Sequence, residues 1–199
     1  MTEELKEAYR KSIYELISSF TQVSDHYWDE LKKRLEFVTY KRNELITKAG
    51  DVEDYLYILV EGSVRTFYRN NQKEYTISFS FAESAFSSYA SLISRKPSRL
   101  DIQALSEVKA FRITYEDTAA LNEKTEDSNI VGRKMLEYYY LAREKKEINL
   151  LSRTAEENYF DLFNEQPEII SSIPQKHIAS YLGITPESLS RIRRKVANY

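Results

Sequence analysis

The sequence contains no cysteine. This absence excludes disulfide bonds, thiolate zinc sites and cysteine-ligated iron–sulfur clusters. Only four glycines and four prolines are present, so few segments resemble flexible linkers. No apolar run approaches the roughly 20 residues that span a bilayer, and the opening "MTEELKEAYRKSIYELISSF" carries charges where a signal peptide would be apolar. We therefore expect a soluble, cytoplasmic protein with no membrane partner.

The composition is typical of a folded protein, with 42% hydrophobic and 30% charged residues and a net charge of −2. The charge is unevenly distributed. Residues 174–199, which begin "PQKHIASYLGITPESLSRIRRK", hold five Lys or Arg side chains and one acid. The positive field is therefore confined to the C-terminal end, and the remainder of the chain is acidic.

The hydrophobic pattern changes twice along the chain. Residues 4–20 and the segment "SDHYWDELKKRLEFV" have helical spacing. From 37 to 113, short runs rich in Val, Ile, Thr, Tyr and Phe alternate with turn residues, and Asn70–Asn71 is a hairpin turn between two of them. This texture favours an antiparallel sandwich or jelly-roll barrel, with one short helix at 87–94. Helical patterns return after Tyr115.

The longest predicted helix carries an apolar stripe whose spacing alternates threes and fours, as in helices that pack against a partner helix. We interpret the stripe as the contact face of a homodimer. The alternative is a helix packed only against its own domain. The stripe residues are Val131, Met135, Tyr138, Leu141, Ala142 and Ile148.

The final segment satisfies the requirements of a helix-turn-helix. The first helix needs a small residue where the second crosses it, and Ala179 supplies it; the turn needs positive φ, and Gly183 supplies that. Thr185 is placed to N-cap the second helix, with Pro186 at its first position. Apolar residues at the required offsets hold the two helices together: Ile178, Leu182, Ile184, Leu189 and Ile192.

The exposed face of the second helix has the chemistry of a DNA-reading surface. Glu187 and Arg191 lie about 160° around the helix from the buried Leu189. Arginine reads guanine, glutamate accepts from the cytosine amine, and cations at the helix end bind phosphate. The alternative is a solvated face with an ordinary Glu187–Arg191 ion pair. The predicted DNA-binding residues are Glu187, Ser188, Ser190, Arg191, Arg193, Arg194, Lys195, Lys176 and His177.

In its order of parts, the chain resembles the Crp/Fnr family of bacterial transcription regulators. The matching motifs are "GDVEDYLYILVEGSVRTFY" (50–68) and "HIASYLGITPESLSRIRRK" (177–195). The resemblance implies an α+β fold: a cyclic-nucleotide-binding-like antiparallel β-roll (jelly-roll-like) sensor domain at 1–126, a long dimerisation helix at 127–150, and a winged-helix or helix-turn-helix DNA-binding domain at 151–199. It also implies Glu187, Ser188 and Arg191 as base-reading positions, with Pro186 where many relatives have Arg.

The expected ligand cassette departs from the family pattern. Cyclic-AMP-binding members have Gly-Glu before a short helix and an Arg-Ser or Arg-Thr pair after it. Here Ser87 and Ser88 replace the first pair, and Ser98 and Arg99 stand at the second. We therefore do not expect cyclic AMP to bind; another small ligand in this pocket, or none, remains open. Neither His26 nor His177 is expected to bind haem or metal, so no cofactor is predicted.

These features predict a sequence-specific DNA-binding regulator that acts as a homodimer on double-stranded DNA, with RNA polymerase as a candidate further partner. A different hypothesis is a β-roll sensor of a ligand or partner whose DNA binding is vestigial. An enzyme is not expected, because no His-Glu metal motif, phosphate loop or nucleophile elbow is present.

Overall fold

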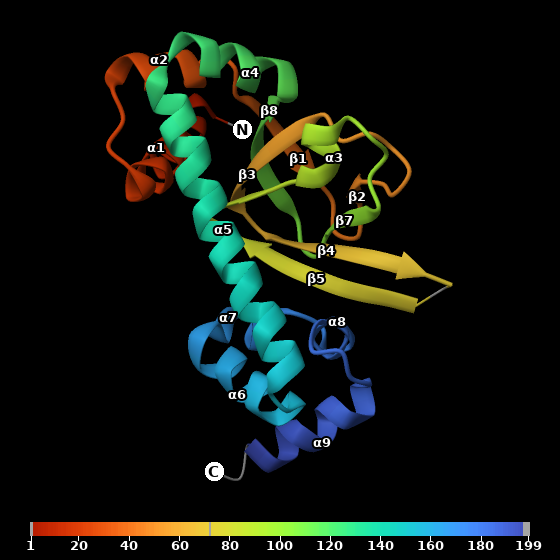
Figure 1. The fold of residues 1–199 in the computed structure, drawn as a ribbon. Helices are drawn as coiled ribbons and strands as arrows, with labels where there is room; N and C mark the ends of the chain where they lie inside the picture. Colours follow the sequence, from red (N-terminus) through yellow and green to blue (C-terminus); the bar gives the residue numbers. More distant parts are fainter. Residues whose placement is uncertain (1, 72, 197–199) are drawn as a thin grey trace. The chain divides into compact units, whose positions relative to one another are not determined.

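The helices and strands follow the predicted order: two helices, a run of strands with one short helix among them, and then helices (Figure 1). The computed structural model describes residues 2–71 and 73–196. The elements are α1 (Glu3–Phe20), α2 (Asp25–Lys32), β1 (Glu36–Tyr40), β2 (Leu45–Thr47), β3 (Tyr55–Glu61), β4 (Ser63–Asn70), β5 (Lys73–Phe81), β6 (Ser84–Phe86), α3 (Tyr89–Ser94), β7 (Leu100–Ala104), β8 (Val108–Thr114), α4 (Tyr115–Lys124), α5 (Glu126–Ser152), α6 (Ala155–Glu165), α7 (Pro167–Ser172), α8 (Gln175–Tyr181) and α9 (Pro186–Val196).

The chain divides into two compact units. The first extends to Arg65 and resumes at Ser80–Tyr138, and the second comprises Thr66–Phe79 and the residues from Tyr139 onward. The boundary therefore falls within β4, β5 and α5. The division predicted from sequence, at 126/127 and 150/151, stays a prediction, and it did not anticipate that a β-hairpin would group with the C-terminal helices.

The strands form the expected roll from two four-stranded sheets, ordered β1-β8-β3-β6 and β2-β7-β4-β5. The pairs β1–β8, β3–β8, β3–β6 and β2–β7 are antiparallel. The predicted hairpin between β4 and β5 is confirmed, since β4 ends at Asn70 and Asn71 has a φ of 46°. Asparagine tolerates this left-handed conformation better than most residues, which is why it marks such turns.

Strand β8 separates two hydrophobic cores within the first unit. Successive side chains of a strand point to opposite faces of its sheet. Val108 and Ala110 accordingly pack inside the roll with Tyr57 and Phe86. Phe111 and Ile113 belong to the other core, together with these residues of α1, α2 and α4: Tyr9, Ile13, Ile17, Tyr27, Leu31 and Leu121.

A glycine at the β3–β4 turn allows two backbone segments to meet. Gly62 has a φ of 96°, in the region that favours glycine. A Cβ at this position would lie 2.2 Å from the carbonyl oxygen of Glu107 and 2.8 Å from Ser106 Oγ. Ser106 Oγ also accepts a hydrogen bond from the Ser63 amide at 2.9 Å. The glycine of the "EGSV" motif is therefore required both by conformation and by space.

The C-terminal helices of the second unit have a core of their own. Thr154 and Glu157 form a capping box at the start of α6. From 139 to 196 the described residues contain helices and no strand, so the helix-turn-helix lacks the β-strands of the predicted winged form. Helix α7 begins at Pro167, because a proline at the first helical position costs no hydrogen bond. The core residues are Tyr159, Leu162, Ile169, Ile173, Ile178, Ala179, Leu182 and Leu189.

Among the described residues, no helix combines the length and the apolar character required to span a membrane.

Candidate nucleic-acid interface

Helices α8 and α9 form the predicted helix-turn-helix, residues 175–196. Gly183 lies in the turn with a φ of 71°. The hydroxyl of Thr185 accepts a hydrogen bond from the Ser188 amide at 3.2 Å, which is the predicted N-cap of α9. The Ile184 amide donates to the carbonyl of Ala179 at 3.0 Å. Local hydrogen bonds thus determine the angle at which α9 leaves the turn.

The apolar residues expected between the two helices are mostly buried. Ala179 and Leu189 are fully buried, and Ile178 and Leu182 are nearly so. Ile184 and Ile192 are only partly buried. Because both helices contribute to one packed core, that core holds α9 in place and leaves its other face exposed.

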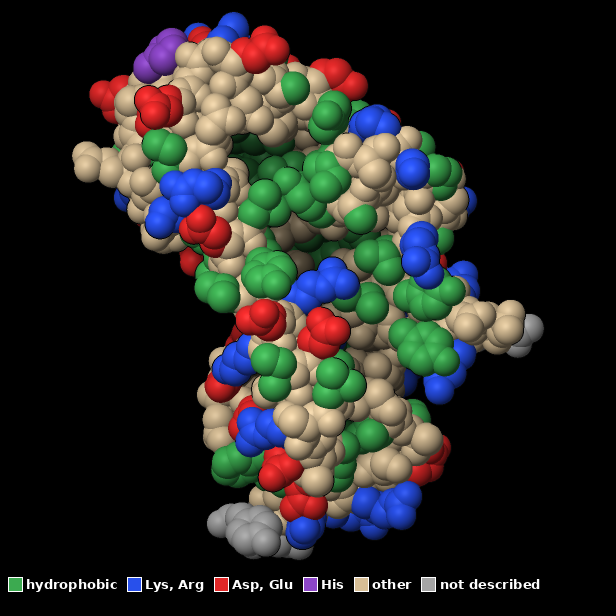
Figure 2. Space-filling view, in the orientation of Figure 1, with side chains coloured by type: hydrophobic (Ala, Val, Ile, Leu, Met, Phe, Trp, Pro, Cys, Tyr) green, Lys and Arg blue, Asp and Glu red, His purple; other side chains and the backbone are tan. Residues whose placement is uncertain are grey.

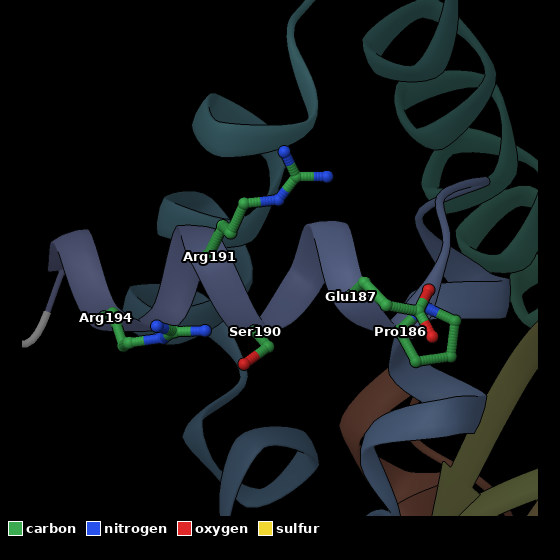
Figure 3. Close-up of a pocket in the computed structure, with 5 residues that line it drawn as sticks. All are labelled: Pro186, Glu187, Ser190, Arg191 and Arg194. Carbon is green, nitrogen blue, oxygen red and sulfur yellow. The ribbon is translucent and has the colours of Figure 1, made fainter.

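That exposed face carries the predicted base-reading side chains. Glu187, Arg191 and Arg194 are exposed, and Ser188 and Ser190 are partly exposed. Glu187, Ser190, Arg191 and Arg194 border a shallow hollow on α9 together with Pro186. Figure 3 shows the Arg191 guanidinium extending away from the helix axis, while Arg194 lies along the helix toward Ser190. The helix therefore offers donors and acceptors along one open side.

The charge of Glu187 is stabilised by its position at the helix start. Its own backbone amide, the Thr185 hydroxyl and Arg191 all lower the pKa of this carboxyl. Within the part of the chain that the structure describes, no ion pair joins Glu187 to Arg191, and the Arg191 guanidinium instead donates to Ser188 Oγ at 3.5 Å. Both charged groups are thus available to a ligand.

The basic residues around the reading face differ in their availability. Lys176 is exposed on α8, and Arg193 is partly buried near the end of α9. Lys195 pairs with Glu156 of α6 at 2.7 Å, so its charge is partly neutralised within the protein. In Figure 2, Lys and Arg side chains are visible on the surface over α9. A phosphate would meet Arg194 and Lys176 more readily than Lys195.

The structure corrects the placement of His177. This residue was predicted to be DNA-facing or on the surface, but it is only 7% exposed. It is the first of three consecutive buried residues of α8, His177, Ile178 and Ala179. Exposure was expected from its place in the first helix of the helix-turn-helix, but the packing of that helix buries it.

The predicted ligand residues only partly converge. Ser88 and Ser98 are buried and their hydroxyls are hydrogen-bonded to each other at 2.7 Å. Ser98 Oγ also donates to the carbonyl of Leu100 at 2.7 Å. Ser87 Oγ donates to the carbonyl of Tyr55 at 2.9 Å, and Arg99 is exposed. The hydroxyls of Ser88 and Ser98 are therefore hydrogen-bonded to each other, and those of Ser87 and Ser98 to the backbone.

Sequence reasoning missed two buried charged side chains of the first unit, Glu53 and Arg65. Glu53 is 3% exposed and accepts hydrogen bonds from its neighbours' amides, those of Asp54 and Tyr55, both at 3.1 Å. Arg65 is 2% exposed and donates to Gln103 Oε1 at 2.9 Å. Alternation in β4 places Arg65 on the face opposite Val64, which packs inside the roll, and nothing local indicated a partner for Arg65 there.

The predicted dimer stripe of α5 divides between two environments. Val131 is 4% exposed, in the helix-covered core of the first unit, so its assignment to the dimer face is corrected. Met135 is partly buried against the same core, and its place on the dimer face stays a prediction. Tyr138 contacts the ring of Phe20 at 5.7 Å but remains 58% exposed. Leu141, Ala142 and Ile148 are exposed.

Comparisons with known proteins agree with this architecture. Residues 37–125 match the family described as the cyclic nucleotide-binding domain. No curated protein sequence matches the chain. FixK2 from Bradyrhizobium japonicum is similar in structure, with a TM-score of 0.70 and 18% identity over 82% of this chain and 85% of that one.

Two further solved structures share the fold. CLP of Xanthomonas campestris, described as a c-di-GMP responsive global regulator, has a TM-score of 0.67 and 14% identity over 88% of this chain and 92% of its own. A Eubacterium rectale protein assigned to the crp/fnr family of transcriptional regulators has a TM-score of 0.68 and 16% identity over 87% and 83%. Residues 37–125 thus match the cyclic nucleotide-binding domain, and the chain shares the fold of solved Crp/Fnr-type transcription regulators.

Proposed function

We propose that this chain is a sequence-specific DNA-binding transcription regulator of the Crp/Fnr type that acts as a homodimer and does not respond to cyclic AMP. The observation that carries the proposal is the exposed face of α9, where Glu187, Ser188 and Arg191 lie together on a helix whose opposite side is buried. The regulators that share the fold support the same assignment and give no support to an enzyme.

The chemistry of this face suits the major groove. A guanidinium such as that of Arg191 donates two hydrogen bonds to the O6 and N7 atoms of guanine, and an ionised Glu187 accepts one from the cytosine amine. Arg194 and Lys176 would contact phosphates, which position the protein without reading sequence. Two such helices related by a two-fold axis would read half-sites about 34 Å apart, which predicts a pseudo-palindromic site.

The internal contacts of the roll support independence from cyclic AMP. The hydroxyl pair of Ser88 and Ser98 takes the place of groups that would hold a cyclic phosphate and ribose. Arg95, another cation of this segment, donates to the carbonyl of Glu53 at 2.7 Å and pairs with Asp54. A ligand phosphate would have to break these contacts before it could gain its own.

Selection from a random duplex library with purified, ligand-free protein at near-physiological salt tests the proposal. Enrichment of a two-fold-symmetric motif is the expected result. Retention of duplexes without sequence preference, with steep salt dependence, would instead favour a sensor whose helix-turn-helix no longer reads DNA.

A further inference from the structure

The hydroxyl of Ser180 hydrogen-bonds the β4–β5 hairpin, Thr66–Phe79 within the second unit, to the helix-turn-helix. Ser180 Oγ, on α8, accepts a hydrogen bond from the Thr76 amide at 2.9 Å and donates one to the carbonyl of Glu74 at 2.7 Å. We call this pair of hydrogen bonds the Ser180 bridge. Ser180 is separated from Thr76 by 104 positions in the sequence, so the bridge is a tertiary feature.

The Ser180 bridge satisfies the open edge of a sheet. Strand β5 is the last strand of the order β2-β7-β4-β5, and an edge strand leaves a row of amides and carbonyls unpaired. Alternate residues of a strand direct these groups to the same side. A serine hydroxyl both donates and accepts, so Ser180 occupies the carbonyl of Glu74 and the amide of Thr76 as a neighbouring strand would.

Aromatic and cationic contacts reinforce the same junction. The rings of Phe79 and Tyr181 lie 5.3 Å apart between centroids. Lys146 of α5 lies 3.5 Å from the centroid of the Tyr181 ring, and its ammonium donates to the carbonyl of Ile77. The hairpin is therefore attached to both α8 and α5 of the second unit.

The hairpin contacts the end of α8 that precedes the turn, while the base-reading side chains lie on the exposed side of α9. Ser180 and Tyr181 are the last two residues of α8. Glu187 and Arg191 remain exposed in the presence of the hairpin. The contact therefore does not cover the reading face, and it can act on DNA recognition only through the orientation of the helix-turn-helix.

The connections of the chain give the hairpin a means of restraining that orientation. The boundary between the two units is crossed in β4 at 65/66, in β5 at 79/80 and in α5 at 138/139. Besides α5, the helix-turn-helix is held by the hairpin, through the Ser180 bridge and the contacts of Tyr181. Of these contacts, the Ser180 bridge is the one that bonds the backbone of β5, and it adds the two strands of the hairpin to α5 as restraints.

We propose that Ser180 is a positioning residue for DNA recognition, which joins the hairpin Thr66–Phe79 to α8 and so limits the orientations available to the helix-turn-helix. This proposal rests on the proposed function. A dimer that binds two half-sites at once must hold both helix-turn-helices in one arrangement, and each orientation excluded in the free protein reduces the entropy lost on binding. Binding to a single half-site imposes no such requirement.

Ser180→Ala tests the proposal with little risk to folding, because it removes one oxygen from a partly buried position. Two controls match it. Thr76→Val changes the hairpin side chain but retains the amide that Ser180 binds. Ser172→Ala removes a hydroxyl that bonds the carbonyl of Glu168 one turn earlier. Thermal unfolding of all three variants confirms that each is folded.

Hydrogen exchange of the Thr76 amide reports the bridge directly. We expect Ser180→Ala to accelerate this exchange by at least about tenfold, because the edge amide becomes open to water, and both controls to leave it slow. Unchanged exchange in Ser180→Ala would overturn the proposal, whatever the DNA results.

Affinity for the selected site and for its half-site tests the positioning role. We expect Ser180→Ala to weaken binding to the full two-fold site by about five- to tenfold and to leave half-site binding unchanged, a split that general loss of stability would not produce. Equal effects on both sites, or none, would overturn the role although the bridge exists. If the wild-type protein selects no sequence, the proposed function fails and this role fails with it, while the exchange result still decides whether the bridge forms.

Discussion

At the scale of single residues, two glycines show how backbone conformation and available space each restrict what a position can hold. Gly62 and Gly50 both have φ near 100°, but they differ in space: a Cβ on Gly62 would meet the carbonyl of Glu107, while a Cβ on Gly50 would meet nothing within 4 Å. Substitution of Gly50 therefore tests conformational strain alone, and substitution of Gly62 tests strain together with steric overlap.

We predict that Gly62→Ala lowers the free energy of unfolding by about 3 kcal/mol or more, because strain and overlap add. Gly50→Ala should cost about 1–2 kcal/mol, from strain alone. Chemical denaturation of the two variants measures the difference. Equal losses would show that the backbone around Glu107 yields to a methyl group.

Arg191 is the residue on which sequence reading is proposed to depend most. We predict that Arg191→Ala loses about 1–3 kcal/mol of binding free energy at the selected site and little on random DNA, because its partner is a base edge. Titration of fluorescent duplexes measures both, and Arg42→Ala, at an exposed position of the first unit, is the control. Equal losses on both duplexes would identify Arg191 as a phosphate contact.

At the scale of elements, α5 has a different environment along its length. Its first turns are packed against the core of the first unit, its middle is exposed, and Lys146 near its end lies against Tyr181 and the carbonyl of Ile77. Where Figure 1 draws α5, the surface in Figure 2 carries both apolar and charged side chains. One helix thus supports predictions of two kinds.

The first concerns pH. Burial, aided by the charge of Arg143, lowers the pKa of Lys146 to about 7. The small cavity beside it is also bordered by Lys145, Asp161 and Glu165, of which Lys145 and Glu165 form an ion pair. Between pH 7 and the ordinary lysine pKa, the unfolded chain binds a proton at Lys146 that the folded chain does not, so stability rises with pH.

We predict that this contribution reaches at most about 1.4 kcal/mol per pH unit in that window and is absent in Lys146→Met, which retains the chain length but cannot titrate. Urea denaturation at several pH values from 7 to 10 measures the slope in both proteins. The same slope in the variant would show that another group is responsible.

The second prediction for α5 concerns assembly. Leu141 and Ile148 are 61% and 55% exposed, and together with Ala142 they form the exposed part of the predicted dimer face. We predict a dimer at micromolar concentration that Leu141→Lys converts to monomer, because the substitution places a charge in an apolar contact. Glu147→Lys, on the other side of the helix, should remain dimeric. Analytical ultracentrifugation decides; a monomeric wild-type protein would contradict the prediction.

At the scale of the whole molecule, the fold was more predictable from the sequence than the tertiary contacts of individual side chains. Gly183 and Thr185 could be assigned from sequence because a turn and an N-cap impose requirements on single residues. Val131 was misplaced because an apolar stripe does not specify whether the same chain or a partner chain will cover it. His177 was misplaced because the polarity of a side chain does not specify how the helix that carries it will pack. The Ser180 bridge leaves no local signal, since any exposed serine on a helix looks the same before the hairpin is placed.

The first unit, which contains the residues that match the cyclic nucleotide-binding domain, permits a prediction about ligand binding. We predict that cyclic AMP at millimolar concentration leaves the melting temperature unchanged, because a ligand stabilises a protein only if it binds the folded state better than the unfolded one. Cyclic di-GMP, named for the similar Xanthomonas regulator, is the comparison ligand. A concentration-dependent rise with cyclic AMP would show that the Ser88–Ser98 contact opens.

The two faces of β8 have a consequence for how the first unit unfolds. Because Val108 and Ala110 support the core inside the roll while Phe111 and Ile113 support the core beneath the helices, neither core can lose β8 without exposing the other. The strands of the roll and the N-terminal helices should therefore unfold in one cooperative transition. The backbone amides of β8 should be among the last in the first unit to exchange with solvent.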